Sequence, residues 1–252
     1  MEEIKDWIDK IGYYDRTKYD KVRLLTYGDW GSGKTRLAAT FPKPFFIDSD
    51  DGGKTLGKLH IPHLVLRPEE KTFDIIMDVL KSLRLKTKPF DTLDIQTVVF
   101  DGLTSLNRML LWESMWYFIS DPNAKKKRMK LDINKQKPQY DHWGELLNRY
   151  ITIIQAAQST NLNVVATAGA KLDKDERSGE FVGGPNIQGQ YQYRIGHDFD
   201  DIYFMTVEGS KYMTYTRQHG RYPAKTRSDR IKAIPVKVEN PTYEILFGGQ
   251  NE

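Results

Sequence analysis

The sequence predicts an α/β fold with a mostly parallel central sheet flanked by helices and an antiparallel β extension at the C-terminus. Short apolar segments alternate with stretches of helical periodicity over the first two thirds of the chain. A glycine-rich turn at 28–35 lies between a predicted strand and a predicted helix. After Asp200, β-type segments follow one another without helices between them, which indicates the antiparallel extension.

The composition limits the class of protein. With 252 residues, of which 39% are apolar and 29% charged, the chain resembles one large globular domain. It has no apolar run long enough to cross a bilayer and an acidic N-terminus, so we expect a cytoplasmic protein without a membrane partner. The absence of cysteine excludes disulfides and thiolate metal sites and fits a reducing compartment.

The parallel part of the sheet is expected between residues 22 and 167. Its strands are short apolar runs, and its helices have apolar residues at three- and four-residue spacing. Pro42 ends the first helix, and Gly52 and Gly53 turn the chain after the second strand. The predicted strands are 22–27, 44–48, 63–66, 95–101 and 163–167, and the predicted helices are 36–40, 73–83, 103–111 and 143–157.

Four further segments complete the expected organisation. The polar residues 1–20 are expected to form a leader that packs on a single domain covering 21–252. Within it, 121–138 is predicted to be a basic loop, and the glycine-rich segment 169–196 a functional loop. The antiparallel extension covers 200–252, with strands expected at 202–207, 212–216, 231–236 and 243–247.

The turn at 28–35 matches the Walker A pattern Gly-x-x-x-x-Gly-Lys-Thr. Glycines allow backbone N–H groups to surround phosphates, and the N-terminus of the following helix favours negative charge. We expect Lys34 to reach the β- and γ-phosphates of ATP and the Thr35 hydroxyl to bind Mg²⁺. The alternative is a chance match in a loop. The predicted nucleotide-binding residues are Gly28, Asp29, Trp30, Gly31, Ser32, Gly33, Lys34, Thr35 and Arg36.

Asp101 is the second candidate metal residue. It ends an apolar strand 67 residues after Lys34, as the Walker B acid does, and a carboxylate there holds Mg²⁺. The alternative is that Asp101 caps the turn or helix that begins at Gly102.

Hydrolysis also needs a group that orients or deprotonates water. Gly102 follows Asp101, so no carboxylate is adjacent there. The acids Asp48, Asp50 and Asp51 end the second strand, and the carboxyl ends of neighbouring parallel strands converge on a ligand. Asp50 is the candidate base, and the alternative is that these acids only cap a turn.

Two basic segments suggest a polyanionic partner. Residues 211–238 contain eight Lys or Arg against one acid, and residues 124–137 contain seven against one. A solvated charged surface is the alternative reading.

These motifs together resemble the RecA core. Walker A, then 46–50 (Phe-Ile-Asp-Ser-Asp), then 98–101 (Val-Val-Phe-Asp), is similar to the compact phage-encoded RecA-like ATPases of the Sak type. Members of that group have a strand ending Asp-Thr-Glu-Gly-Gly, matched here by 48–53. The resemblance implies that the acid at 50 activates water. This chain departs from the pattern with the shorter Asp and an additional acid beside it.

The segment 224–227 (Ala-Lys-Thr-Arg) is similar to the Lys-x-Arg of RecA-type ATPases. The resemblance implies that Lys225 and Arg227 reach the γ-phosphate held by a neighbouring subunit, so catalysis would require a homo-oligomeric ring or filament. A solvated hairpin tip is the alternative.

The resemblance also implies a phosphate sensor and a DNA-binding loop. Thr167 ends the predicted strand 163–167, where this fold places the sensor, while Gly169 stands in the region where the phage group often has a histidine. Segment 169–196 corresponds to the DNA-binding loops, and rings beside cations suit single-stranded DNA. The alternative is that its aromatic residues pack on the core. Its candidate DNA contacts are Lys171, Lys174, Arg177, Phe181, Tyr191, Tyr193 and Arg194.

The resemblance therefore implies a DNA-dependent ATPase that uses ATP and Mg²⁺ in recombination or annealing, with single-stranded DNA and a single-strand DNA-binding protein as partners. Three alternatives remain open at this point: another P-loop motor of the helicase or packaging type, a nucleotide-gated DNA-binding module with little turnover, and a small-molecule kinase. Oligomer number, DNA polarity and the choice between ATP and GTP stay undetermined.

Overall fold

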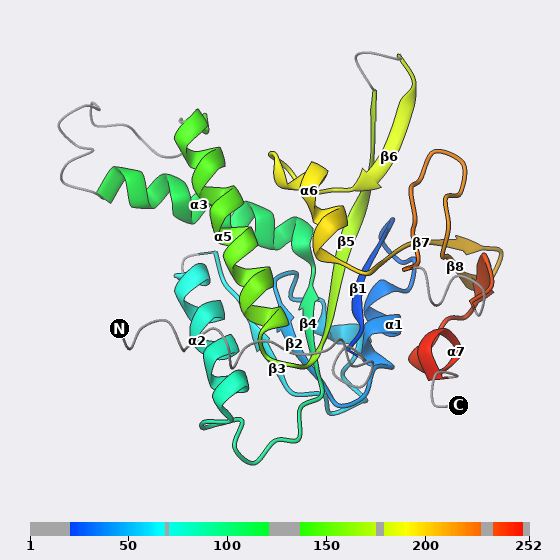
Figure 1. Ribbon diagram of the computed structural model, residues 1–252, viewed down its shortest axis with the longest axis horizontal. Coiled ribbons are helices and arrows are strands. Elements are labelled where there is room, and N and C mark those ends of the chain that lie inside the picture. Colours follow the sequence, from blue (N-terminus) through cyan, green and yellow to red (C-terminus); the bar gives the residue numbers. More distant parts are fainter. Residues whose placement is uncertain (1–20, 69–70, 121–136, 175–178, 228–233, 249–252) are drawn as a thin grey trace, which may run out of the picture.

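The computed structural model describes residues 21–68, 71–120, 137–174, 179–227 and 234–248 (Figure 1). A central sheet lies between two layers of helices. The helices α2 (Thr72–Leu85), α3 (Leu103–Ser120), α5 (Tyr140–Gln158) and α6 (Tyr191–Asp198) pack on one face. The helices α1 (Lys34–Ala39) and α7 (Tyr243–Phe247) pack on the other.

Among the described residues, the sheet has the strand order β3-β2-β4-β5-β1-β7-β8-β9, with β6 paired to β5. The strands from β3 to β7 in this order are parallel, and β6, β8 and β9 are antiparallel to their neighbours. The predicted α/β fold class is therefore confirmed. The strands are β1 (Arg23–Gly28), β2 (Pro44–Asp48), β3 (His63–Val65), β4 (Thr97–Asp101), β5 (Asn163–Lys174), β6 (Phe181–Pro185), β7 (Asp201–Glu208), β8 (Lys211–Tyr215) and β9 (Lys237–Glu239).

The core occupies both sides of the sheet. In β1, Leu25 and Tyr27 pack under the larger helix layer, and Leu24 packs under α1 and α7. Because both faces are covered, the parallel strands are buried at consecutive positions, rather than at alternate ones, over most of their length. This explains why the sequence shows them as continuous apolar runs.

The strand order brings the candidate site together. Strand β5 lies between β1 and β4, so Gly28 pairs with Gly169, and Asp101 pairs with Asp48 of β2. The carboxyl ends of β1, β2, β4 and β5 therefore meet at one edge of the sheet, where open α/β sheets bind their ligands.

Several strand predictions for the C-terminal extension were wrong. In the predicted strand 231–236, the described residues 234–236 form no strand, and β9 follows them at Lys237–Glu239. Segment 202–207 was expected to be antiparallel, but β7 runs parallel to β1 because α6 provides the crossover, and the antiparallel part begins at β8. Segment 243–247 was expected to be a strand and forms α7. The Thr242 hydroxyl caps this helix by accepting the N–H of Ile245, and adjacent Leu246 and Phe247 are both buried.

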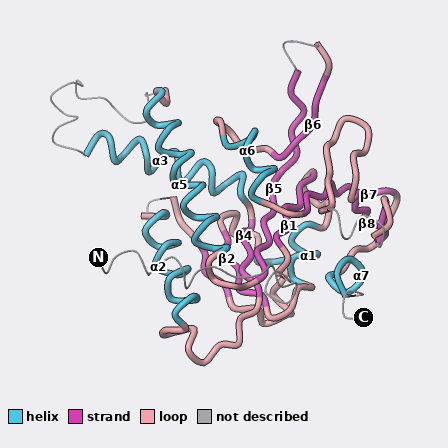
Figure 2. Tube along the Cα trace, in the orientation of Figure 1, coloured by secondary structure: helices cyan, strands magenta, loops and turns pink. Residues whose placement is uncertain are grey.

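Segment 169–196 was also mispredicted as a loop. It continues β5, returns as β6 and then forms α6 (Figure 2). The polar residues and glycines that indicated a loop lie in a projecting two-stranded hairpin, which has too little apolar surface to show a strand pattern.

Other expectations fall partly outside the described residues. These are the leader 1–20, residues 121–136 of the basic loop and residues 231–233 of the predicted strand 231–236. In the described part of the chain, every helix is too short or too polar to pass through a lipid bilayer.

Candidate active site

The Walker A segment forms a turn between β1 and α1, at the carboxyl edge of the sheet. Gly31 and Gly33 have φ angles of 75° and 90°, a left-handed conformation that glycine adopts without steric cost. At Gly33 a side chain would also collide with the ring of Tyr212, because an added Cβ would lie 2.8 Å from it. Glycine at position 33 is thus favoured both by the backbone conformation and by the nearby Tyr212 ring.

Lys34 lies folded over this turn. Its Nζ donates hydrogen bonds to the carbonyl oxygens of Gly28 (3.0 Å) and Asp29 (2.7 Å) and to the hydroxyl of Ser32 (3.2 Å). Burial lowers the pKa of Lys34, and the carboxylates of Asp101, Asp29 and Asp50 oppose this shift. The ammonium is therefore already positioned where phosphate oxygens could replace its three neutral acceptors.

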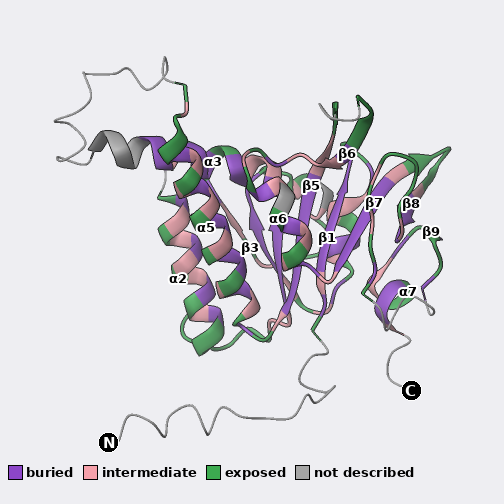
Figure 3. Cartoon of the chain, turned by 45° about the horizontal axis from the view of Figure 1, so that its top comes forward, coloured by how far each residue is buried: buried purple, intermediate pink, exposed green. Residues whose placement is uncertain are grey.

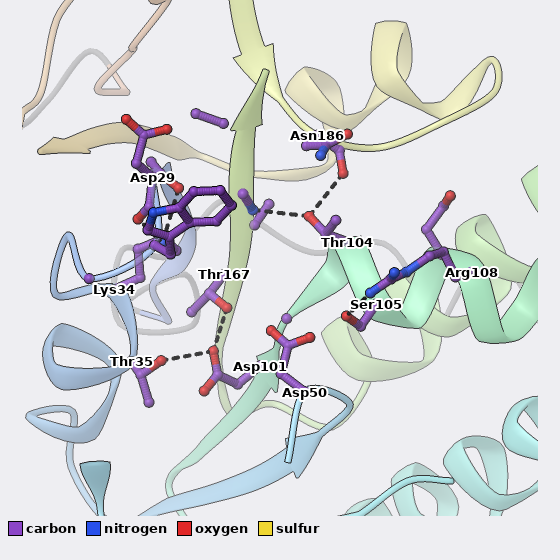
Figure 4. Close-up of a pocket in the computed structure, with 18 of the residues that line it drawn as sticks. Asp29, Lys34, Thr35, Asp50, Asp101, Thr104, Ser105, Arg108, Thr167 and Asn186 are labelled. Carbon is purple, nitrogen blue, oxygen red and sulfur yellow. Dashed lines mark hydrogen bonds between the residues drawn. The ribbon is translucent and has the colours of Figure 1, made fainter. Parts of the chain in front are cut away.

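Asp101 contacts two hydroxyl groups. Its Oδ1 accepts hydrogen bonds from Thr35 (3.2 Å) and from Thr167 on the neighbouring strand β5 (Figure 4). Burial raises the pKa of Asp101, the two hydroxyls act against the shift, and the nearby carboxylates of Asp48 and Asp50 add to it. A divalent cation would stabilise the charged form of such a carboxylate.

Thr35 and Asp101 fit the Mg²⁺ that a P-loop implies. In the described part of the chain there is no cluster of three or more His, Asp or Glu side chains that could hold a metal by itself. Mg²⁺ is usually held by one or two protein oxygens together with substrate phosphates and water, so the pair at 35 and 101 is a sufficient protein contribution.

The structure distinguishes between the three acids that follow β2. Asp48 is buried and accepts the N–H groups of Asp50 (2.9 Å) and Gly52 (3.4 Å), so it stabilises the turn. Asp51 lines a different cavity. Asp50 is exposed and lines the same cavity as Lys34.

This cavity has a volume of about 670 Å³ and lies above the carboxyl edge of the sheet (Figure 4). One wall is the Walker A turn, including Trp30, whose side chain is 96% exposed. The floor is formed by Asp50, Asp101 and Thr167. The opposite wall is polar and consists of Thr104, Ser105, Asn107, Arg108, Asn186 and Gln188.

Sequence reasoning missed this opposite wall. Thr104 accepts the N–H of Gly169 (2.9 Å) and donates to the carbonyl of Asn186 (2.9 Å). Asn107 donates to the carbonyl of Gln188 (3.3 Å). The first turns of α3 therefore hold the segment that follows β6 against the cavity. The available signal was the helical spacing of the polar residues after Asp101, which place one polar face beside the pocket.

A second cavity of about 690 Å³ adjoins the first, and Gly31, Lys34 and Thr35 line both. The guanidinium of Arg36 lies 5.5 Å from the centre of the Tyr212 ring at this cavity. Lys54 and Lys58 line it as well. It offers an aromatic ring and cations directly beside the phosphate-binding turn, where the nucleoside part of a nucleotide would have room.

Lys225 and Arg227 do not line the cavity of their own chain. Lys225 forms a β-bridge with Ile202, near the amino end of β7, and its Nζ donates to the carbonyl of Gly196. Arg227 forms an ion pair with Asp200, and its side chain is 70% exposed. Neither cation is therefore among the residues that line the cavity beside the Walker A turn of the same chain.

The predicted DNA contacts have different environments. Lys174 and Phe181 are exposed on the β5–β6 hairpin, with Phe181 45% exposed (Figure 3). Lys171 pairs with Asp173 (2.6 Å) and with Gln192, and Arg194 is exposed on α6. Arg177 and the side chain of Tyr193 lie outside the described residues.

Tyr191 was wrongly predicted to contact DNA. Its side chain is 1% exposed and stacks on Tyr150 at 4.7 Å between ring centroids. The ring belongs to the core between α5 and α6, so no base can stack on it in this structure.

Comparisons with known proteins identify the family of the chain. Among solved structures, the chain is similar to a KaiC-like protein from Pyrococcus horikoshii, over 76% of each chain, with 9% identity and a TM-score of 0.42. It is also similar to the RadB recombinase, over 80% of this chain and 83% of that one, with 17% identity and a TM-score of 0.39. No curated protein sequence matches it. The profile of the AAA domain matches residues 20–228, which include every element from β1 to β8 and the Walker A turn, and the chain therefore belongs to the AAA domain family.

Proposed function

We propose that this AAA domain hydrolyses ATP with Mg²⁺, assembles as a homo-oligomer and binds single-stranded DNA in recombination or annealing. The observation that carries the ATPase part is the convergence of Lys34, Thr35, Asp101 and Asp50 on one cavity at the carboxyl edge of the sheet. These residues come from three different strand ends, and a fold brings such a set together by chance only rarely.

In the proposed reaction, the oxygen of a water molecule forms a bond to the γ-phosphorus, and the bond from that phosphorus to the β–γ bridging oxygen breaks. The products are ADP and inorganic phosphate. Asp50 accepts the proton of the water, since it is the one carboxylate of its cluster that faces the cavity. Lys34 stabilises the charge of the phosphoryl oxygens. Thr35 and Asp101 would hold a Mg²⁺ ion, whose chemistry would be to neutralise phosphate charge.

Assembly is supported by the positions of Lys225 and Arg227. Both are exposed and lie away from the cavity of their own chain. In an oligomer, one protomer would present these cations to the phosphates of the next, which makes turnover depend on protein concentration.

DNA binding is supported by the hairpin of β5 and β6. Lys174 and Phe181 project from it, and the guanidinium of Arg221 lies 5.7 Å from the centre of the Phe181 ring. An exposed ring beside cations suits single-stranded nucleic acid, because bases stack on the ring while cations follow the backbone. Thr104 connects the base of this hairpin to the nucleotide cavity.

The test is the ATPase rate of the full chain, measured over a range of protein concentrations with and without single-stranded DNA. We expect the rate per protomer to rise with protein concentration and to rise further with DNA. A rate that DNA leaves unchanged at every concentration would contradict the DNA-binding part. A concentration-independent rate would contradict the assembly part.

A further inference from the structure

Arg108 is a cation in the cavity that the roles above do not use. It lies on α3, seven residues after Asp101, and lines the cavity wall opposite the Walker A turn. Its side chain is exposed, and its Nη2 donates a hydrogen bond to the hydroxyl of Ser105 (3.0 Å). Figure 4 shows Arg108 and Ser105 across the cavity from Lys34, with Asp50 and Asp101 between them.

Acidic side chains outnumber basic ones among the described residues that line the cavity. The positively charged residues are Lys34 and Arg108, and the negatively charged residues are Asp29, Asp50 and Asp101. A nucleoside triphosphate adds further negative charge next to Asp50. The negative charges of the triphosphate and of the carboxylates repel each other strongly in a partly desolvated site. Without Arg108, Lys34 would be the one cation among the described lining residues that offsets this repulsion.

Arg108 is also free to bind an anion. Arg149, by contrast, is neutralised within the structure by ion pairs with Glu113 and Glu145. For Arg108, no ion pair is formed with any of the described residues, and its partner Ser105 is an uncharged acceptor. The Ser105 hydroxyl orients the guanidinium without neutralising it, and the remaining N–H donors stay available.

We propose that Arg108 forms a second anion subsite within the same chain, which binds the terminal phosphoryl group of ATP from the side opposite Lys34. The proposal rests on the proposed function, because it takes the cavity to hold a nucleoside triphosphate. Ser105 is the positioning residue of this subsite. Since hydrolysis transfers the terminal phosphoryl group to water, the same guanidinium contacts the inorganic phosphate before its release.

The contribution of Arg108 can be separated from that of a neighbouring protomer's cations by its dependence on protein concentration. A contribution of Arg108 is internal to one chain, so its effect on nucleotide affinity is the same at every protein concentration. A contribution of Lys225 and Arg227, which lie away from their own cavity, appears only when protomers associate.

The test measures the affinity of the full chain for ADP and for a non-hydrolysable ATP analogue, each with Mg²⁺, by calorimetry. Arg108→Ala should weaken binding of the ATP analogue about tenfold or more, as expected for the loss of charge-assisted hydrogen bonds, and leave ADP affinity unchanged. Arg108→Lys should retain part of the preference for the ATP analogue over ADP. Arg84→Ala, which removes an exposed arginine of α2 far from the cavity lining, is the matched control and should change neither affinity.

Two outcomes overturn the subsite while leaving the proposed function intact. One is an Arg108→Ala variant that binds the ATP analogue as tightly as the unaltered protein. The other is an equal loss of ADP and analogue binding in both Arg108 variants, which would give the arginine a role in the fold or in the whole nucleotide. If the unaltered protein binds neither nucleotide, the proposed function itself is wrong, and the subsite is wrong with it.

Discussion

Asp101 and Asp50 give this site two carboxylates in different surroundings, and Gly102 leaves room for the second. Asp101 is oriented by the hydroxyls of Thr35 and Thr167, which fits it to hold a metal. Gly102 follows it without a side chain, and an added Cβ there would come within 2.7 Å of Oδ2 of Asp50. The space that a side chain at 102 would fill is therefore occupied by a carboxylate from a different strand end.

Replacing the Asp50 carboxylate tests its task. We expect Asp50→Asn to lower kcat about a hundredfold or more while nucleotide affinity changes little, because an amide cannot accept the proton of water. Steady-state ATPase rates and equilibrium binding of a non-hydrolysable analogue separate the two effects. The matched control is Asp51→Asn, whose side chain lines a different cavity and should leave kcat within about twofold of the unaltered protein. Equal activity of both variants would exclude Asp50 as the base.

At the scale of elements, α3 connects the metal residue, the opposite cavity wall and the hairpin. Its orientation is set by a largely buried ion cluster. Arg149 of α5 pairs with Glu113 of α3 (3.0 Å) and with Glu145 (2.8 Å), and its guanidinium lies 5.1 Å from the centre of the Phe73 ring. Glu113 also accepts the backbone N–H of Phe73 at the start of α2 (3.0 Å). One cluster thus joins the three long helices.

Removing Arg149 should destabilise the whole helix layer. Arg149→Ala leaves the largely buried carboxylate of Glu113 without its cation, and we expect the free energy of unfolding to fall by about 3–5 kcal/mol. Urea denaturation followed by circular dichroism measures this change. Arg84→Ala, at an exposed position of α2, should stay within about 0.5 kcal/mol of the unaltered protein. A comparable loss in both variants would show that the cluster has no special role.

The β5–β6 hairpin is the second element with a separable role. Phe181→Ala should weaken binding to single-stranded oligothymidine about tenfold, because one stacking contact is lost, and should leave ATP binding unchanged. Fluorescence anisotropy at several salt concentrations gives the affinity and its salt dependence. Leu85→Ala removes a comparably exposed apolar side chain from α2 and is the control. If both variants bind DNA like the unaltered protein, the hairpin is not the contact surface.

At the scale of the whole molecule, the nucleotide cavity lies at the carboxyl edge of the sheet, and Lys225 and Arg227 lie away from it. A head-to-tail arrangement would bring the cations of one protomer to the cavity of the next, and such heterologous contacts form rings or filaments. Each active site would then contain residues of two chains.

Mixing two inactive variants tests this arrangement. Lys34→Ala should abolish nucleotide binding in its own cavity, and Arg227→Ala should lower turnover about a thousandfold by removing the cation supplied to a neighbour. The mixture should regain ATPase activity, because the intact cavity of one variant meets the intact Arg227 of the other. A mixture no more active than its components, together with monomers that hydrolyse ATP at the full rate, would contradict composite sites.

The sequence alone determined the local chemistry of this protein. The strands β1 to β4, the turn of the Walker A segment and the place of Asp101 at the end of β4 were predictable, because apolar runs and glycine patterns reflect interactions between residues near one another in the chain. The same reasoning made Asp50 the candidate base but gave no means of excluding Asp48 and Asp51. The three carboxylates differ in their surroundings: Asp48 accepts a backbone N–H, Asp50 lines the cavity beside Lys34, and Asp51 lines another cavity. These surroundings exist only after the strands have paired.

Only the tertiary structure decided what depends on distant partners. Segment 243–247 has a strand-like composition, yet it is a helix because Leu246 and Phe247 pack beside α1, about two hundred residues earlier in the chain. The sequence allowed Tyr191 to be a surface ring, but in the structure it is buried against Tyr150 of α5. Nothing in the sequence assigned Arg108 to the site, because a single arginine on a helix belongs to no recognisable motif. Its proposed role follows from the cavity, whose lining combines strand ends, the first turns of α3 and the segment that follows β6.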